Sequence, residues 1–266
     1  MARCCSQAQR MAACMAGRPG VGSCCGGWVA TQMVLCPVSR QLSTFPDPGL
    51  VPAGHQRSVE TVSFSPDSRQ LASGGWDKRV MLWDVQSGQM LRLLVGHRDS
   101  IQSSDFSPTV NCLATGSWDS TVRIWDLRTG TPAVSHQALE GHSGNISCLC
   151  YSASGLLASG SWDKTIHIWK PTTSSLLIQL KGHVTWVKSI AFSPDELWLA
   201  SAGYSRMVKV WDCNTGKCLE TLKQGVLDVA HTCAFTPDGK ILVSGAADQT
   251  RRQISRTSKS ARDPQT

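Results

Sequence analysis

Hydrophobic and polar residues alternate in short runs through the central part of the chain. Runs such as TVRIWD and TIHIWK place branched apolar side chains at every second position, which is the period of a β-strand with one buried face. Stretches rich in Gly, Ser, Asp and Pro separate these runs and have the composition of tight turns. No stretch keeps the 3.6-residue period of a helix. The pattern therefore predicts an all-β protein built from short antiparallel strands.

The runs recur in the same order within a unit that repeats along the chain. Each unit contains a Gly-His pair, a strand ending in Phe-Ser-Pro or a similar turn, a strand of the type Leu-Ala-Ser-Gly, a strand ending in tryptophan, and a fourth apolar strand. The Gly-His pairs lie at residues 54–55, 96–97, 141–142 and 182–183, so the units are 42, 45 and 41 residues apart. A fifth unit begins near Gly225, where Val226 replaces the histidine.

Units of this length that carry Gly-His and Trp-Asp pairs resemble the WD-repeat β-propeller family, in which each unit forms a four-stranded blade. The resemblance covers residues 54–248. It implies full blades at residues 55–96, 97–141, 142–182 and 183–225, and then a partial blade at residues 226–254 that lacks a fourth strand. Because the family usually closes a ring of seven blades, we expect an incomplete propeller that forms an open arc, as a variant of a longer protein.

The segments outside the repeats differ from them in composition. Residues 1–53 are rich in cysteine and residues 255–266 are polar and basic, so we expect an unstructured head and a disordered tail. The net charge of +7 is confined to the ends, because residues 54–248 hold as many acidic as basic side chains. A neutral repeat region offers no basic stripe to nucleic acid, and no run of about 18 apolar residues is present to span a membrane. We therefore expect neither nucleic acid nor a membrane as a partner.

The cysteines of the repeats bear on metal binding and on the compartment. They lie in apolar segments and lack the C-x-x-C spacing of a metal site, at Cys112, Cys148, Cys150, Cys213, Cys218 and Cys233. This usage is typical of small core residues in a reducing compartment, so we expect a cytoplasmic or nuclear protein without a metal. The scattered arginines of the head resemble a mitochondrial transit peptide only weakly, and we do not expect that targeting.

The family resemblance assigns a structural role to one tryptophan, one hydroxyl, one histidine and one aspartate in each unit. In the family these side chains form a hydrogen-bonded chain, called the tetrad below. The matching residues are Trp83, Ser73, His55 and Asp77, then Trp125, Thr115, His97 and Asp119, and then Trp169, Ser159, His142 and Asp163. The fourth unit keeps Trp211, Ser201 and His183 but has Ser205 in place of the aspartate. The fifth unit keeps Ser244 and Asp248, and Ile254 stands where the tryptophan should be.

A serine, a histidine and an aspartate also form the catalytic triad of many hydrolases. Two points favour the structural role. The set occurs in three units, and the family resemblance implies that the Ser or Thr hydroxyl contacts the tryptophan indole rather than a substrate. The sequence contains no H-E-x-x-H, P-loop or G-x-S-x-G signature. We therefore expect a non-catalytic protein that uses no cofactor and no small-molecule substrate.

A second set of aromatic residues directly precedes the tetrad aspartate or its replacement. Its members are Trp76, Trp118, Trp162 and Tyr204, in a turn that the family places on the top face around the central channel. One explanation is that these rings pack on the neighbouring blade. The other is a binding surface, because such turns are normally polar and large rigid rings are typical of interface hot spots. We expect the same face to include Trp186, Lys188, Glu60 and Gln102. The sequence thus predicts a scaffold that binds a protein or peptide on this face.

An alternative function rests on residues 113–128. Their sequence, LATGSWDSTVRIWDLR, ends in Trp-Asp-x-Arg and resembles the box that docks onto the adaptor of cullin-4 ubiquitin ligases. No other unit carries this ending, and such boxes also arise by chance in ordinary repeats. Arg128 is therefore either the docking residue of a substrate receptor or a solvated cation.

Overall fold

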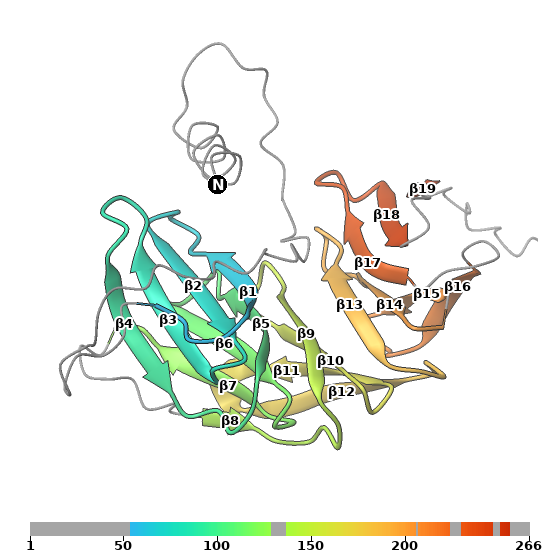
Figure 1. Ribbon diagram of the computed structural model, residues 1–266. Helices are drawn as coiled ribbons and strands as arrows, with labels where there is room; N and C mark the ends of the chain where they lie inside the picture. The colour runs from blue at the N-terminus through green and yellow to red at the C-terminus, as the bar shows by residue number, and fades with distance from the viewer. Residues whose placement is uncertain (1–53, 129–136, 206, 224–229, 247–250, 256–266) are drawn as a thin grey trace, which may run out of the picture.

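The computed structural model describes residues 54–128, 137–205, 207–223, 230–246 and 251–255 (Figure 1). These residues form antiparallel sheets whose strands follow the chain order, which confirms the predicted all-β fold of propeller-type repeats. The helical structure among them is one 3-10 turn, η1 (Pro171–Thr173). The expected head and residues 256–266 of the expected tail lie outside the described residues.

Each sheet is one blade, and four blades have four strands while the fifth has three described strands. The first two blades comprise β1 (Val59–Phe64), β2 (Gln70–Gly75), β3 (Arg79–Asp84) and β4 (Met90–Val95), then β5 (Ile101–Phe106), β6 (Cys112–Ser117), β7 (Val122–Asp126) and β8 (Gln137–Leu139). The next two comprise β9 (Ile146–Tyr151), β10 (Leu157–Ser161), β11 (Thr165–Lys170) and β12 (Ser175–Lys181), then β13 (Val187–Phe192), β14 (Trp198–Gly203), β15 (Met207–Asp212) and β16 (Cys218–Lys223). The fifth comprises β17 (Ala230–Phe235), β18 (Ile241–Ala246) and β19 (Arg251–Ser255).

The five blades follow one another around an arc, from the blue first blade to the red fifth blade in Figure 1. The first strand of each blade lies against the first strand of the next, in the order β1, β5, β9, β13 and β17. Short hydroxyl side chains join these inner strands. Thr61 Oγ1 accepts a hydrogen bond from Ser104 N at 3.0 Å, and Ser103 Oγ accepts one from Leu149 N at 3.0 Å. Polar residues therefore fasten adjacent blades where the strands come closest to the centre.

The apolar core lies between adjacent blades rather than within one of them. Leu82 and Leu94 of the first blade share a buried cluster with Phe106, Leu113 and Trp125 of the second. Comparable clusters join the second blade to the third, the third to the fourth and the fourth to the fifth. Because the apolar face of a blade is buried by its neighbour, stability here is a property of blade pairs.

The tryptophan that ends the third strand lies in these interfaces. Trp125 and Trp211 are at most 1% exposed. Gly182, from the preceding Gly-His pair, has φ +148°, and a Cβ atom on it would lie 3.1 Å from the Trp211 ring. Glycine is therefore needed for this close approach. In the fifth blade Ile254 pairs with Leu242, the register position that tryptophan has in the other blades.

The first strand of each described blade contains a β-bulge near its start, which we did not predict. In β1 the register shifts between Val59 and Thr61 and leaves Glu60 as the extra residue. The equivalent extra residues in the other blades are Gln102, Ser147, Lys188 and His231. A sequence signal does exist, because Val59 and Val62 are three positions apart where a regular strand has two. Bulges redirect side chains next to sites, and these five residues line one level of the inner strands.

Candidate functional site

The tetrads connect the turn between the second and third strands to the loop that enters each blade. In the second blade, His97 Nδ1 lies 2.8 Å from Asp119 Oδ2 and His97 Nε2 lies 2.8 Å from Thr115 Oγ1. Trp125 Nε1 donates to the same hydroxyl oxygen at 2.8 Å, and Arg98 N donates to Asp119 Oδ2 at 2.8 Å. The first and third blades have the same contacts between side chains at 2.7 to 2.9 Å, through His55, Ser73, Asp77 and Trp83 and through His142, Ser159, Asp163 and Trp169.

This geometry defines the proton positions and argues against a nucleophilic hydroxyl. Thr115 Oγ1 accepts from the indole of Trp125, so its own proton is the one that serves His97 Nε2, and His97 Nδ1 donates to Asp119. Burial alone would raise the pKa of Asp119, but hydrogen bonds from His97 and Thr121 hold it well below its usual range. The Thr115 side chain is fully buried between two aromatic rings. The set therefore holds the turn in place and presents no hydroxyl to a substrate.

The fourth blade contains the incomplete tetrad that the sequence predicts. His183 Nε2 lies 2.7 Å from Ser201 Oγ, and Trp211 Nε1 donates to Ser201 Oγ at 2.7 Å. Ser205 occupies the turn position of the aspartate, and His183 Nδ1 is buried without a hydrogen-bond partner among the described residues. Burial, and to a smaller extent the charge of Lys209, lower the pKa of His183 to about 4. This histidine is therefore neutral at pH 7.

The aromatic rings of the top face form one continuous row, called the aromatic belt below and made up of Trp76, Trp118, Trp162, Trp186 and Tyr204. Successive ring centroids along the belt are 5.5, 5.6, 4.2 and 5.4 Å apart. Trp162 and Trp186 are stacked with an angle of 4° between their planes. Each ring thus contacts the next across four consecutive blades, a range at which aromatic pairs attract one another.

The belt is packed and exposed at the same time. Trp76 and Tyr204 are each 44% exposed and Trp186 is 40% exposed, while Trp118 and Trp162 are half-buried. The turns that carry the rings are held by the backbone, as where Trp118 N donates to the carbonyl oxygen of the entering loop at 2.9 Å. The rings therefore pack on neighbouring blades, as the first explanation required, and still present a rigid apolar surface, as the second required.

The three other residues expected near this face lie on the first strands of their blades rather than in the turns that carry the belt. Glu60, Gln102 and Lys188 are half-buried bulge residues at the second position of β1, β5 and β13. Gln102 Nε2 donates to Ser100 Oγ at 2.9 Å, which ties it to its own loop. We did not predict a role for His231, whose ring centroid lies 6.3 Å from that of Tyr204 and extends the aromatic contacts into the fifth blade.

Exposed cations outnumber exposed carboxylates on the described loops and turns of this edge. The exposed cations are Arg57, Lys78, Arg98, Lys164 and Lys181, and the exposed carboxylates are Asp99 and Glu140. Lys78 Nζ donates to the carbonyl oxygen of Arg98 at 2.8 Å and so bridges the first and second blades. The three tetrad aspartates are hydrogen-bonded to histidines and keep their negative charge beneath this surface. The exposed side chains around the belt are thus more often basic than acidic.

Comparison with known proteins agrees with this geometry. The WD domain, G-beta repeat family matches residues 42–84, 88–126, 134–170, 174–212 and 216–250. The chain belongs to the WD-repeat family. Over 136 residues, 51% of its length, it is 97% identical to a stretch that makes up 43% of WD repeat-containing protein 38 of Homo sapiens.

Two further relatives extend the comparison. A stretch of 70 residues, 26% of the chain, is 80% identical to 23% of WD repeat-containing protein 38 of Mus musculus. A longer stretch of 204 residues, 74% of the chain, is 39% identical to 60% of the small ribosomal subunit protein RACK1y of Oryza sativa subsp. japonica. The aligned stretches thus span less than half the length of the human and mouse relatives.

Arg128 lies just past β7, and its side chain is 72% exposed. Its guanidinium is paired with the carboxylate of Asp126, the aspartate that follows Trp125. Arg128 Nη2 donates to Asp126 Oδ2 at 2.6 Å, and Nε donates to Oδ1 at 3.0 Å. The carboxylate of Asp126 also raises the pKa of Arg128 further above its usual value. The structure therefore places this arginine at the surface, held in a two-pronged ion pair with its neighbour.

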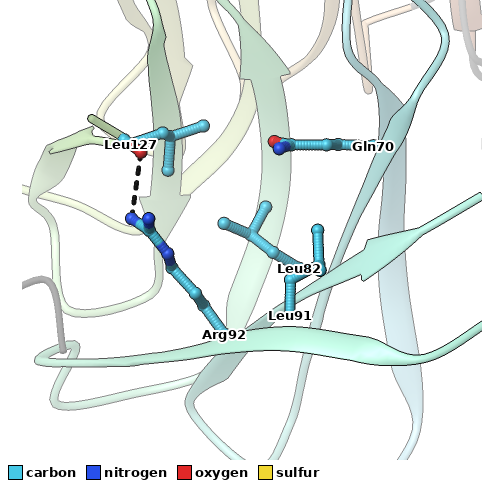
Figure 2. A pocket seen from close by; sticks show the side chains of 5 residues that line it. All are labelled: Gln70, Leu82, Leu91, Arg92 and Leu127. Carbon is cyan, nitrogen blue, oxygen red and sulfur yellow. Dashed lines mark hydrogen bonds between the residues drawn. The ribbon is translucent and has the colours of Figure 1, made fainter. Parts of the chain in front are cut away.

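A cavity of about 310 Å³ lies between the first two blades, away from the aromatic belt. Figure 2 shows its lining, which consists of Gln70, Leu82, Leu91, Arg92 and Leu127. Arg92 Nη1 donates to the carbonyl oxygen of Leu127 at 3.0 Å and closes one side. Since the lining contains no titratable group other than this arginine, the cavity has no chemistry of a catalytic site.

The described cysteines are all free thiols, and they are not all core residues. Cys148 and Cys233 are buried as expected, whereas Cys218 is exposed on β16, contrary to our prediction. The reason is that β16 is the outermost strand of its blade, with one edge unpaired in its sheet. Across the described ranges, no group of three or more His, Cys, Asp or Glu side chains is placed to hold a metal ion. No helical segment there has the length and apolarity to cross a membrane.

Proposed function

We propose that this chain is a non-catalytic interaction scaffold that binds a segment of another protein along the aromatic belt. The observation that carries the proposal is the unbroken contact of five aromatic rings with exposed faces across four blades. Large rigid rings lose little conformational entropy on binding, and tryptophan and tyrosine are enriched at interface hot spots. Membership of the WD-repeat family supports the same role, because protein assembly is the usual task of its propellers.

The tetrads support this proposal by making the surface rigid. Each hydrogen-bonded chain fixes one turn of the belt against the entering loop of its blade, as His97 and Asp119 do for Trp118. A pre-formed surface binds more tightly, because less freedom is lost when the complex forms. We place the protein in the cytoplasm or nucleus, and we expect its partners to be proteins or peptides rather than nucleic acid, membrane or small molecules.

The belt is tested by removing two rings at once. We expect Trp118→Ala combined with Trp162→Ala to weaken binding of recovered partners at least about 30-fold, which corresponds to about 2 kcal/mol at a hot spot. Affinity purification with the full chain supplies the partners, and calorimetric titration gives the dissociation constants. Leu177→Ala is the matched control, because Leu177 is 48% exposed on the outer strand β12. Partners that bind the double variant and the wild type equally would show that the belt is packing alone.

A second function is substrate receptor of a cullin-4 ubiquitin ligase. The observation that favours it is the surface position of Arg128 at the end of the Trp-Asp-x-Arg stretch. In that role the guanidinium would exchange its contact with Asp126 for a contact on the adaptor. The first proposal differs from this one in the face that binds, since Arg128 lies at the opposite end of the third strand from the turn that carries Trp118.

A further inference from the structure

The fourth blade presents an unusual group of buried polar atoms beside the aromatic belt. His183 is 6% exposed, and its Nδ1 atom has no hydrogen-bond partner among the described residues. Thr185 Oγ1, on the same entering loop, and Ser205 Oγ, in the facing turn, are also buried without a partner there. In the first three blades the corresponding histidine nitrogen contacts an aspartate. Buried polar groups without partners are uncommon and call for an explanation.

The described backbone between His183 and Ser205 makes the same contact as in the complete blades. Tyr204 N donates to the carbonyl oxygen of Trp186 at 3.1 Å, just as Trp118 N does to that of Ser100 at 2.9 Å. A Cβ atom on Gly203 would lie 3.6 Å from His183 Nδ1, so the turn approaches the histidine closely. Among the described residues the side chain differs, because serine has two heavy atoms fewer than aspartate. The donors of a tetrad are thus in place without the carboxylate that they serve elsewhere.

The proton on His183 makes this group a donor site. Ser201 Oγ accepts from Trp211 Nε1, so its own proton is directed at His183 Nε2 and the ring proton lies on Nδ1. In the second and third blades the aspartate Oδ2 also accepts from the backbone N–H that follows the histidine, and Val184 is the residue that follows His183 in the sequence. An acceptor that fits two N–H donors and adjacent hydroxyls is a carboxylate.

Access and charge favour a carboxylate that comes from outside the chain. The side chains next to His183 are exposed, Val184 at 63% and Tyr204 at 44%, so surface groups rather than core groups cover the site. The positive charge of Lys209 acts on His183 itself, and no tetrad carboxylate offsets it in the turn of this blade, where Ser205 stands. Trp186 and Tyr204 of the belt border the site, so a segment bound on the belt passes over it.

We infer that the fourth blade takes an aspartate or glutamate side chain of the partner, whose carboxylate completes the tetrad of His183 from outside. The inference rests on the proposed function, because it makes the ligand of the aromatic belt an acidic segment. It adds a point of specificity, since one acidic residue must lie at a fixed distance from the residues that contact the rings.

The site itself is tested without a partner by Ser205→Asp in the full chain. If a carboxylate fits, this variant should raise the midpoint of thermal unfolding by about 3 °C or more, and should raise the pKa of His183 from about 4 toward its usual 6.5 or above, followed by NMR. Ser143→Asp is the matched control, because it adds the same charge to the same edge at an exposed residue of a complete blade. An unchanged midpoint together with an unchanged pKa would overturn the inference.

The partner's chemistry is tested with a displayed library of random 12-residue peptides selected on the full chain. We expect selected peptides to share an acidic residue at a fixed spacing from aromatic or aliphatic residues. Replacing it by Asn or Gln should weaken binding about tenfold or more to the wild type, the value of a charged hydrogen bond, and hardly at all to Ser205→Asp. Selected peptides without an acidic preference would overturn the inference.

Two further outcomes separate this inference from the proposed function. If sodium acetate raises the pKa of His183 but no acidic preference appears among peptides, the site takes small anions only and the inference is wrong. If the acidic preference depends on Ser205 but survives Trp118→Ala with Trp162→Ala, the carboxylate site stands and the aromatic belt is rejected as the binding surface. Loss of binding in the double tryptophan variant with no effect of Ser205→Asp supports the belt alone.

Discussion

The second and fourth blades have the same register in their first three strands, but their buried histidines differ in hydrogen bonding. His97 is bound on both ring nitrogens, whereas His183 is bound only on Nε2 among the described residues. The indole, hydroxyl and imidazole contacts agree between the two blades to within 0.1 Å. The inner half of the tetrad therefore forms without the aspartate, because strand pairing and interblade packing already position those three side chains. The aspartate lies in the surface turn, where its substitution removes the hydrogen-bond acceptor of the histidine without changing the fold.

The largest effect that tests this comparison comes from removing the acceptor in the complete blade. Asp119→Ala leaves His97 Nδ1 buried without an acceptor and frees Arg98 N and Thr121, so we expect a loss of about 2–3 kcal/mol in the free energy of unfolding. Thermal or urea unfolding measures it. Ser205→Ala is the control, since Ser205 Oγ has no partner among the described residues, and its effect should stay within about 0.5 kcal/mol. Equal losses in both variants would mean that the two turns do not differ as described.

The pH dependence of the free energy of unfolding gives a second, smaller difference between the two blades. Burial lowers the pKa of His183 to about 4, below the value near 6.5 expected in the unfolded chain. The unfolded state therefore binds the proton more readily, so the stability contributed by neutral His183 is complete above pH 6.5 and is lost as the pH falls toward 4. Between pH 7 and 5 we expect the wild type to lose on the order of 1–2 kcal/mol more than His183→Gln or Ser205→Asp.

Other groups titrate in the same range, so the slopes of stability against pH must be compared between variants. Burial lowers the pKa of His167 to about 4, and burial raises the pKa of Asp105 to about 6, which opposes the histidines as the pH falls. Both groups are unchanged in the His183 and Ser205 variants, so their contributions cancel when the slope of a variant is subtracted from that of the wild type. Urea unfolding at several pH values gives the slopes. Parallel slopes for the wild type and Ser205→Asp would contradict the assignment to His183.

The smallest effect concerns the strand ends, where the second blade reads Trp-Asp-x-Arg and the fourth reads Trp-Asp-x-Asn. Arg128→Ala should change the free energy of unfolding by less than about 0.5 kcal/mol, because exposed ion pairs contribute little. Its functional test is co-precipitation of the cullin-4 ligase adaptor, with Asn214→Ala in the fourth blade as the matched control. Adaptor that co-precipitates with the wild type and is lost with Arg128→Ala supports the alternative function. Adaptor that is absent from the wild type, or retained by the variant, removes it.

Much of the fold and of the structural network could be predicted from the sequence. The order of strands, the four-stranded repeats and the tetrad residues follow from periodicity and from the family's motifs, because both are written in local residue order. The missing aspartate at Ser205 is equally visible in the sequence. Glu60, Gln102 and Lys188 were expected at the top face, but the bulges that hold them, and the position of His231, were missed, since a bulge depends on how one strand pairs with the next.

The sequence by itself determined that the chain forms β-blades and which residues hold each blade, because strand period, turn chemistry and tetrad contacts act within one unit. Only the tertiary structure decided that Trp186 stacks on Trp162 and meets Tyr204 edge-on, and that the belt rings stay exposed while packed. These properties depend on the angle and distance between blades, which no single repeat encodes. The tertiary structure also decided that His183 Nδ1 has no hydrogen-bond acceptor among the described residues. Any neighbouring segment could have supplied one, so the sequence of the fourth unit does not settle it.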